Sequence, residues 1–147
     1  MLNAATKGAG AMAMTGIRLW AGAMAALALV PAPAAAQSRR IIAVQNDCPQ
    51  PIEFFIHHAD RPDGWHPHGW YRLDAGEGPV TFQDNGIALT KLTDHHLYIY
   101  ARTTEGDPQS LEGPPGVEVR FGGAVFNARR LVTEIDDRGR TLARISC

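Results

Sequence analysis

The sequence of residues 97–121 is LYIYARTTEGDPQSLEGPPGVEVRF, and this stretch decides the fold class. Its first five residues are aromatic and aliphatic, and its last five alternate between apolar and charged side chains. Both compositions favour β-strands, and the alternation places Val117, Val119 and Phe121 on one face. Residues 103–116 between them contain three prolines and three glycines, which predict a long surface loop.

Strand and turn signals alternate along the chain on both sides of this stretch. The pair Asn85-Gly86 favours a tight hairpin turn, whereas residues 59–68, with two prolines and one glycine, are predicted to form a loop. No segment shows sustained helical periodicity. The sequence therefore predicts an all-β fold, an antiparallel β-sandwich or flattened barrel of about eight short strands. The further strands are expected at residues 40–46, 52–57, 70–73, 80–82, 87–92, 124–127 and 131–135.

Residues 1–36 differ in composition from the rest of the chain. They contain all four methionines but only two charged side chains, Lys7 and Arg18. An apolar run at residues 17–30 precedes the small-residue stretch PAPAAA, a pattern typical of a helical signal peptide with a cleavage site at its end. The run is shorter than the roughly 20 residues that span a bilayer, so a permanent anchor is the weaker alternative. We expect a signal peptide at residues 1–36, a single β domain at residues 37–147, a periplasmic or secreted location, and no membrane span after cleavage.

The charge balance of the expected mature domain excludes one class of partner. The whole chain has 14 Lys and Arg against 15 Asp and Glu, and the leader takes Lys7 and Arg18. Residues 37–147 are left with a formal charge of −3 when histidine is neutral. Because nucleic-acid binding requires a basic face, we expect no nucleic-acid partner.

Two cysteines, Cys48 and Cys147, remain after the leader. Export to an oxidising compartment favours their pairing in a disulfide. Closing a loop of roughly 100 residues would stabilise the fold by ~4–5 kcal/mol in the chain-entropy model. The alternative is two free thiols.

The pattern W-x-x-x-G-W-Y-x-L-x-x-G at residues 65–76 lies between a strand ending in Asn46 and the aromatic strand at residues 97–101. This arrangement resembles a family of small exported bacterial domains known as domain of unknown function 1036. The resemblance covers about residues 40–102 and implies a fold type and an envelope location, without an activity to inherit. The chain departs from the family pattern at four positions. Gln45 and Gly78 stand where the family has Cys, so the family's disulfide does not carry over. Tyr71 stands in place of a Trp, and Ala75 in place of a Pro.

All six histidines lie between residues 57 and 96, as His57-His58, His66-Pro67-His68 and His95-His96. Imidazoles are preferred protein ligands for Zn²⁺, Cu²⁺ and Ni²⁺. Because His66 and His68 share one side of an extended segment, a metal site would combine them with a ring from another pair. The candidate ligands are therefore His66, His68, His58 and His96, with Asp60 or Asp63 as oxygen donors. The alternative is that these histidines are solvent-facing side chains without a ligand.

Trp65, Trp70 and Tyr71 form the densest aromatic cluster and are the candidate ligand-binding residues. Such a cluster can stack on sugars or peptides, although one tryptophan often fills the core instead. Trp70 and Tyr71 are expected on opposite faces of a strand, with Trp70 inside and Trp65 on the preceding loop.

Sequence signatures of catalysis are missing. The chain contains no G-x-S-x-G, H-E-x-x-H, phosphate-binding or dinucleotide-binding motif. We therefore predict a non-enzymatic binding module for an envelope protein, glycan or small ligand, held by residues 59–69 and 103–116. The alternative is a histidine-based module for Zn²⁺ or Cu²⁺, and a hydrolase that uses carboxylates comes last. Convergence of the histidine rings would support the metal-binding module. A concave surface lined by Trp65 and Tyr71 would support the module that binds an envelope protein, glycan or small ligand.

Overall fold

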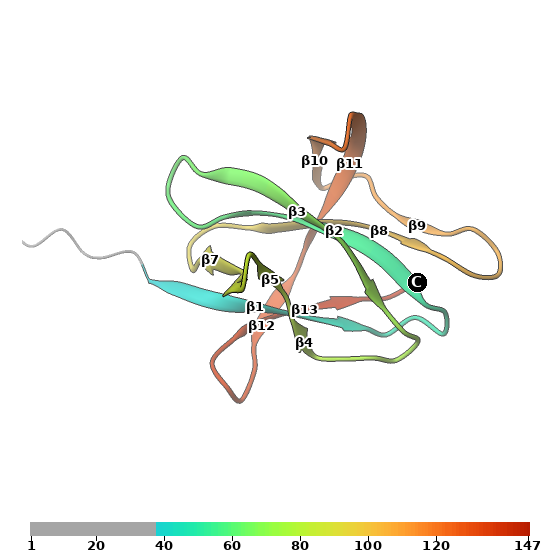
Figure 1. Ribbon diagram of the computed structural model, residues 1–147, viewed down its shortest axis with the longest axis horizontal. Helices are drawn as coiled ribbons and strands as arrows, with labels where there is room; N and C mark the ends of the chain where they lie inside the picture. The colour runs from blue at the N-terminus through green and yellow to red at the C-terminus, as the bar shows by residue number, and fades with distance from the viewer. Residues whose placement is uncertain (1–37) are drawn as a thin grey trace, which may run out of the picture. The chain divides into compact units, whose positions relative to one another are not determined.

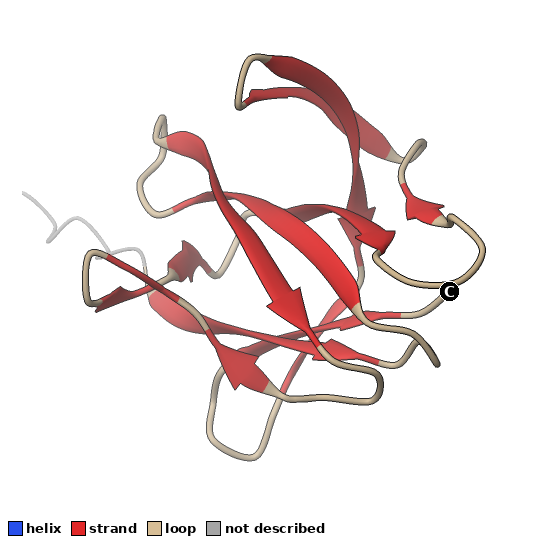
Figure 2. Cartoon of the chain, turned by 45° about the vertical axis from the view of Figure 1, so that its right-hand side comes forward, coloured by secondary structure: helices blue, strands red, loops and turns tan. Residues whose placement is uncertain are grey.

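A computed structural model describes residues 38–147, so the expected signal peptide lies outside the described residues. The described part is all-β and has no helix, which confirms the predicted fold class (Figures 1 and 2). No helix in this part is long and apolar enough to cross a membrane. The strands are β1 (Arg39–Asn46), β2 (Ile52–Ala59), β3 (Trp65–Leu73), β4 (Val80–Thr81), β5 (Gln83–Asp84), β6 (Ile87–Ala88), β7 (Thr90–Leu92), β8 (Leu97–Thr103), β9 (Ser110–Leu111), β10 (Gly116–Phe121), β11 (Ala124–Leu131), β12 (Thr133–Ile135) and β13 (Thr141–Ile145).

Two curled sheets form a half-barrel (Figure 2). The first has the order β12-β13-β1-β4, with β7 also paired to β1, and the second has the order β10-β11-β8-β2-β3, with β9 paired to β8. Strands β5 and β6 form a separate small hairpin. Most neighbours are antiparallel, but β1 and β13 run parallel, from Ile42 opposite Thr141 to Asn46 opposite Ile145. The last strand thus lies beside the first.

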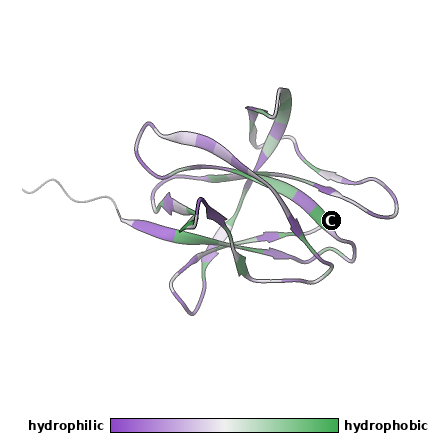
Figure 3. Cartoon of the chain, in the orientation of Figure 1, coloured by the Kyte–Doolittle hydropathy of each residue, from purple (hydrophilic) through white to green (hydrophobic). Residues whose placement is uncertain are grey.

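Strand β2 separates two hydrophobic clusters because its side chains alternate between faces. Phe54 and Ile56 belong to the main core, together with residues of β1, β8 and β13, and both are fully buried. Phe55 faces the other way, into a smaller cluster with Val119 and Ala128 of the β10–β11 hairpin. Hydrophobic colour in Figure 3 is concentrated on the central strands, while the connecting loops are mostly hydrophilic.

The start of β3 corrects the prediction of a loop at residues 59–68. Residues 65–68 pair with β2 over the register from Ala59 opposite Trp65 to Ile56 opposite His68. Pro67 is compatible with this strand because β3 is the last strand of its sheet, where one edge needs no hydrogen-bond donor. Residues 110–111, also predicted as loop, form the short strand β9. The predicted turn at Asn85-Gly86 joins β5 and β6, and Asn85 has the positive φ of 49° that such a turn requires.

Gly69 marks the point where β3 comes closest to β2. The register between the strands shifts here, between Phe54 and Phe55. The φ of Gly69 is +149°, and a Cβ on this residue would lie 2.8 Å from the Phe54 carbonyl oxygen and from the Phe55 Cα. Only glycine therefore fits at this position of the motif.

Cys48 and Cys147 form a disulfide, with their Cα atoms 5.2 Å apart, which confirms the predicted pairing. The adjacent Asn46 is fully buried and fixes the chain before Cys48. Its amide nitrogen donates to the carbonyl oxygens of Gln50 and Asp74, and its Oδ1 accepts from the Cys48 backbone N–H. Because all these buried polar groups are paired, Asn46 holds the first half of the bridge in place.

Candidate metal centre

Three histidines meet on the side of β2 and β3 that faces β7 and the β5–β6 hairpin. His58 of β2 lies directly opposite His66 of β3, and His68 lies two residues further along β3 on the same face. The ring centroids are 4.7 Å apart for His58 and His66, 4.7 Å for His66 and His68, and 5.2 Å for His58 and His68. One ring nitrogen from each residue lies within 4.8 Å of the other two. We call these residues the histidine cluster.

The fourth candidate ligand, His96, does not join the histidine cluster. Its Nε2 is 3.3 Å from Nη1 of Arg130, and its ring centroid is 6.4 Å from that of Tyr98. His57 points to the opposite face of β2, against Trp65, while His95 lies 2.9 Å from Asp94 through Nδ1. The two adjacent histidines of β2, His57 and His58, therefore lie on opposite faces of that strand.

A cleft of about 530 Å³ opens beside the histidine cluster. Its wall includes the β5–β6 hairpin, the start of β1 and the backbone around Thr90. Four charged side chains line it in addition to the histidines. These are Arg39, Asp60, Arg61 and Asp84. Asp63, the other carboxylate considered as a ligand, is exposed and does not line the cleft.

Several buried polar atoms of the cleft make no hydrogen bond of normal geometry within residues 38–147. His58 is only 2% exposed, yet neither of its ring nitrogens makes a hydrogen bond of normal geometry. Oδ1 of Asp60 is also buried without a hydrogen bond, and it lies 4.0 Å from Nε of Arg61. Buried polar atoms are seldom left in this state, because each costs about 1–3 kcal/mol. A bound cation would satisfy the His58 imidazole.

Burial lowers the pKa of two of the three residues, His58 and His68. Burial lowers the pKa of His58 to about 4, helped by repulsion from His66 and His68 and opposed by the Thr90 backbone and Asp60. The pKa of His68 is lowered by burial and by His66, against the attraction of Asp84 and Asp60. Both rings are therefore neutral at neutral pH, which is the form that binds metal ions.

The donor atoms of the histidine cluster suit a small divalent ion. Zn²⁺ binds imidazole nitrogen at ~2.0–2.1 Å, so three nitrogens on one tetrahedral ion lie roughly 3–3.5 Å apart. The three nitrogens lie within 4.8 Å of one another, so they would have to approach one another further to bind one ion. A set of three imidazoles is a donor set that Zn²⁺ and Cu²⁺ accept.

The metal-free protein should lose stability as the pH falls through the range between the two pKa values of His58. The unfolded chain binds a proton near pH 6.5, whereas the folded chain binds it only near pH 4, so the unfolded state gains protons first. Stability is complete above about 6.5 and decreases by about 3 kcal/mol as the pH approaches 4. Urea unfolding at a series of pH values measures this slope. A His58→Phe variant should show a flatter profile, and an equal slope in both proteins would contradict the assignment to His58.

The aromatic candidates do not share one surface. Trp65 and Trp70 lie on the outer face of β3, where they are 38% and 37% exposed. Tyr71 faces the main core, with its ring centroid 4.6 Å from Phe82. The prediction that Trp70 lies inside is therefore wrong.

Trp70 lies on the outer face because the shift in register near Gly69 interrupts the alternation of side chains along β3, which is the edge strand of its sheet. Its ring centroid is 5.3 Å from that of Phe55 and 5.4 Å from that of Phe126, so it covers the rim of the smaller cluster. The guanidinium of Arg102 lies 5.0 Å from the Trp70 ring centroid. This cation–π contact screens the ring from solvent on one side.

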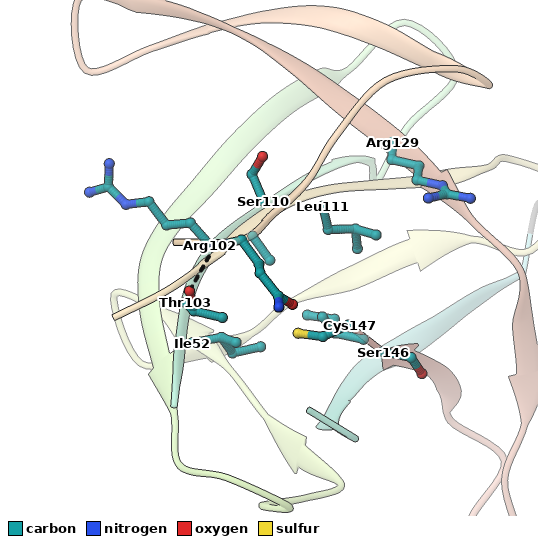
Figure 4. Close-up of a pocket in the computed structure, with 11 residues that line it drawn as sticks. Ile52, Arg102, Thr103, Ser110, Leu111, Arg129, Ser146 and Cys147 are labelled. Carbon is teal, nitrogen blue, oxygen red and sulfur yellow. Dashed lines mark hydrogen bonds between the residues drawn. The ribbon is translucent and has the colours of Figure 1, made fainter. Parts of the chain in front are cut away.

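A second cavity lies next to the C-terminal residue, with a volume of about 170 Å³. Figure 4 shows Ile52, Leu111 and Cys147 around it, while the guanidinium groups of Arg102 and Arg129 point away in opposite directions. The volume is below the ~300–1,000 Å³ typical of small-molecule sites. We therefore take the cleft at the histidine cluster as the candidate site.

No family model matches this chain, and no curated protein sequence or solved structure is significantly similar to it. The candidate site therefore stands on its own geometry.

Proposed function

We propose that the protein is an exported metal-binding module that holds a divalent transition-metal ion through His58, His66 and His68. The observation that carries this proposal is the convergence of three imidazole nitrogens within 4.8 Å on one sheet face. The burial of His58, whose ring nitrogens make no hydrogen bond of normal geometry, also supports it. The general order of divalent affinities places Cu²⁺ above Zn²⁺ for such ligands.

Calorimetric titration of the exported protein, without a histidine affinity tag, tests this function. We expect one equivalent of Zn²⁺ or Cu²⁺ to bind with a dissociation constant near micromolar or tighter, about −8 kcal/mol or stronger. A double variant with His95→Gln and His96→Gln should bind equally well, because neither ring belongs to the histidine cluster. Absence of binding at this level would overturn the proposal.

A second candidate is the binding of a glycan or an envelope peptide on the outer face. A shallow pocket of about 330 Å³ is lined by His57, Trp65, Tyr98 and Val117. An exposed indole bordered by a polar imidazole is suited to stacking on a sugar ring or an extended peptide. Quenching of tryptophan fluorescence in the wild type, and its loss in a Trp65→Ala variant, would support this candidate.

A further inference from the structure

The histidine cluster supplies three protein ligands and leaves a coordination position open. Among residues 38–147, no carboxylate oxygen belongs to the group of donor atoms that lie within 4.8 Å of one another. Asp60 and Asp84 line the same cleft without joining this group. A tetrahedral ion bound by the cluster would therefore need a fourth ligand from outside this group of donor atoms.

Asp84 lies beside His68 rather than within this group. Its Oδ2 lies 3.5 Å from Nδ1 of His68. A carboxylate beside one ring nitrogen favours the proton on that nitrogen and leaves the other free for a metal. Asp84 is held in β5, directly before the tight β5–β6 turn, so the fold places its carboxylate beside His68.

The open position faces a cleft whose charge favours anions once the ion is bound. The cleft is about 530 Å³ in volume, large enough for water and a small ligand together. Two arginines, Arg39 and Arg61, and two aspartates, Asp60 and Asp84, line the cleft, and Nε of Arg61 lies 4.0 Å from Oδ1 of Asp60. A divalent cation adds to the arginines and makes the loaded cleft positive, which attracts anions from solution.

We infer that the metal centre is an open three-histidine site whose fourth ligand is a water molecule that small carboxylate anions displace. This inference rests on the proposed metal-binding function and deepens it by naming the class of external ligand. In the exchange, a carboxylate oxygen forms a bond to the ion as the bond to water breaks, and no electron or proton needs to be transferred. Arg39 and Arg61 attract the anion to the cleft.

Cobalt substitution tests the open position directly. Co²⁺ bound at the histidine cluster has visible absorption bands that respond to its ligands, and acetate is the carboxylate probe. We expect acetate to change the spectrum saturably. An Arg39→Gln/Arg61→Gln variant should bind acetate about three- to tenfold more weakly without losing Co²⁺ affinity, because its loaded cleft is less positive. The matched control is Arg138→Gln, an exposed arginine in the β12–β13 turn, which should behave as the wild type.

The outcomes separate this inference from the proposed function. Failure to bind Co²⁺ would overturn both. Binding of Co²⁺ with a spectrum that saturating acetate does not change would overturn the open position alone and leave metal binding intact. A saturable change with equal acetate affinity in the arginine variant would overturn the role of Arg39 and Arg61.

Discussion

A His66→Ala variant is expected to bind Zn²⁺ or Cu²⁺ at least about a hundredfold more weakly than the wild type, a loss of about 2.7 kcal/mol or more. His66 is the central member of the histidine cluster, because its ring centroid lies 4.7 Å from both of the others. Its removal leaves two imidazoles, and these are the more widely separated pair at 5.2 Å. Competition with a coloured chelator of known affinity measures the loss.

His66 is a better position for this test than His58, because His66 is partly exposed whereas His58 is buried in the fold. The matched control is His96→Ala, which removes an imidazole outside the histidine cluster and should keep wild-type affinity. Thermal unfolding of the metal-free variants verifies that both are folded. If His66→Ala binds as tightly as His96→Ala, the metal lies elsewhere and the histidine cluster is not the site.

The second large effect is expected from the disulfide. A Cys147→Ser variant should lose about 4–5 kcal/mol of unfolding free energy, since the bridge spans 99 residues of sequence. This is a large share of the 5–15 kcal/mol typical of small proteins. Urea unfolding of the variant beside the oxidised wild type gives the difference.

Reduction of the wild type with a thiol provides the control for this prediction, because it opens the same bridge without changing a residue. Both treatments should give similar urea midpoints. A Ser146→Ala variant, next to the bridge and at the same exposed chain end, should remain close to the wild type. A loss below about 1 kcal/mol would show that the bridge does not constrain the unfolded chain as the entropy model requires.

The fold could be predicted from local patterns where those patterns do not depend on distant partners. Alternation at residues 117–121 corresponds to β10, the aromatic run at residues 97–101 begins β8, and the Asn85-Gly86 pair forms the hairpin turn. The error at residues 65–68 has a physical cause. Proline argues against a strand in the interior of a sheet but not at its edge, and the order of strands is not visible in a local pattern.

The candidate site could be predicted only in part for the same reason. The i, i+2 spacing of His66 and His68 places them on one face of a strand, which a sequence pattern can show. The third ligand depends on the register that sets His58, and not His57, opposite His66. The position of Asp84 beside His68 has no signal in the sequence, because it depends on how the β5–β6 hairpin packs on a distant strand.

The parallel pairing of β1 with β13 has a consequence for how the molecule forms during its synthesis. The first sheet places β13 between β12 and β1, so a segment synthesised about a hundred residues after β1 occupies an inner place in that sheet. Contacts between chain ends separated by about a hundred residues give a high contact order, which slows folding. Nascent chains that stop before residue 141 expose the unpaired side of β1, and such intermediates should be substrates for chaperones and proteases.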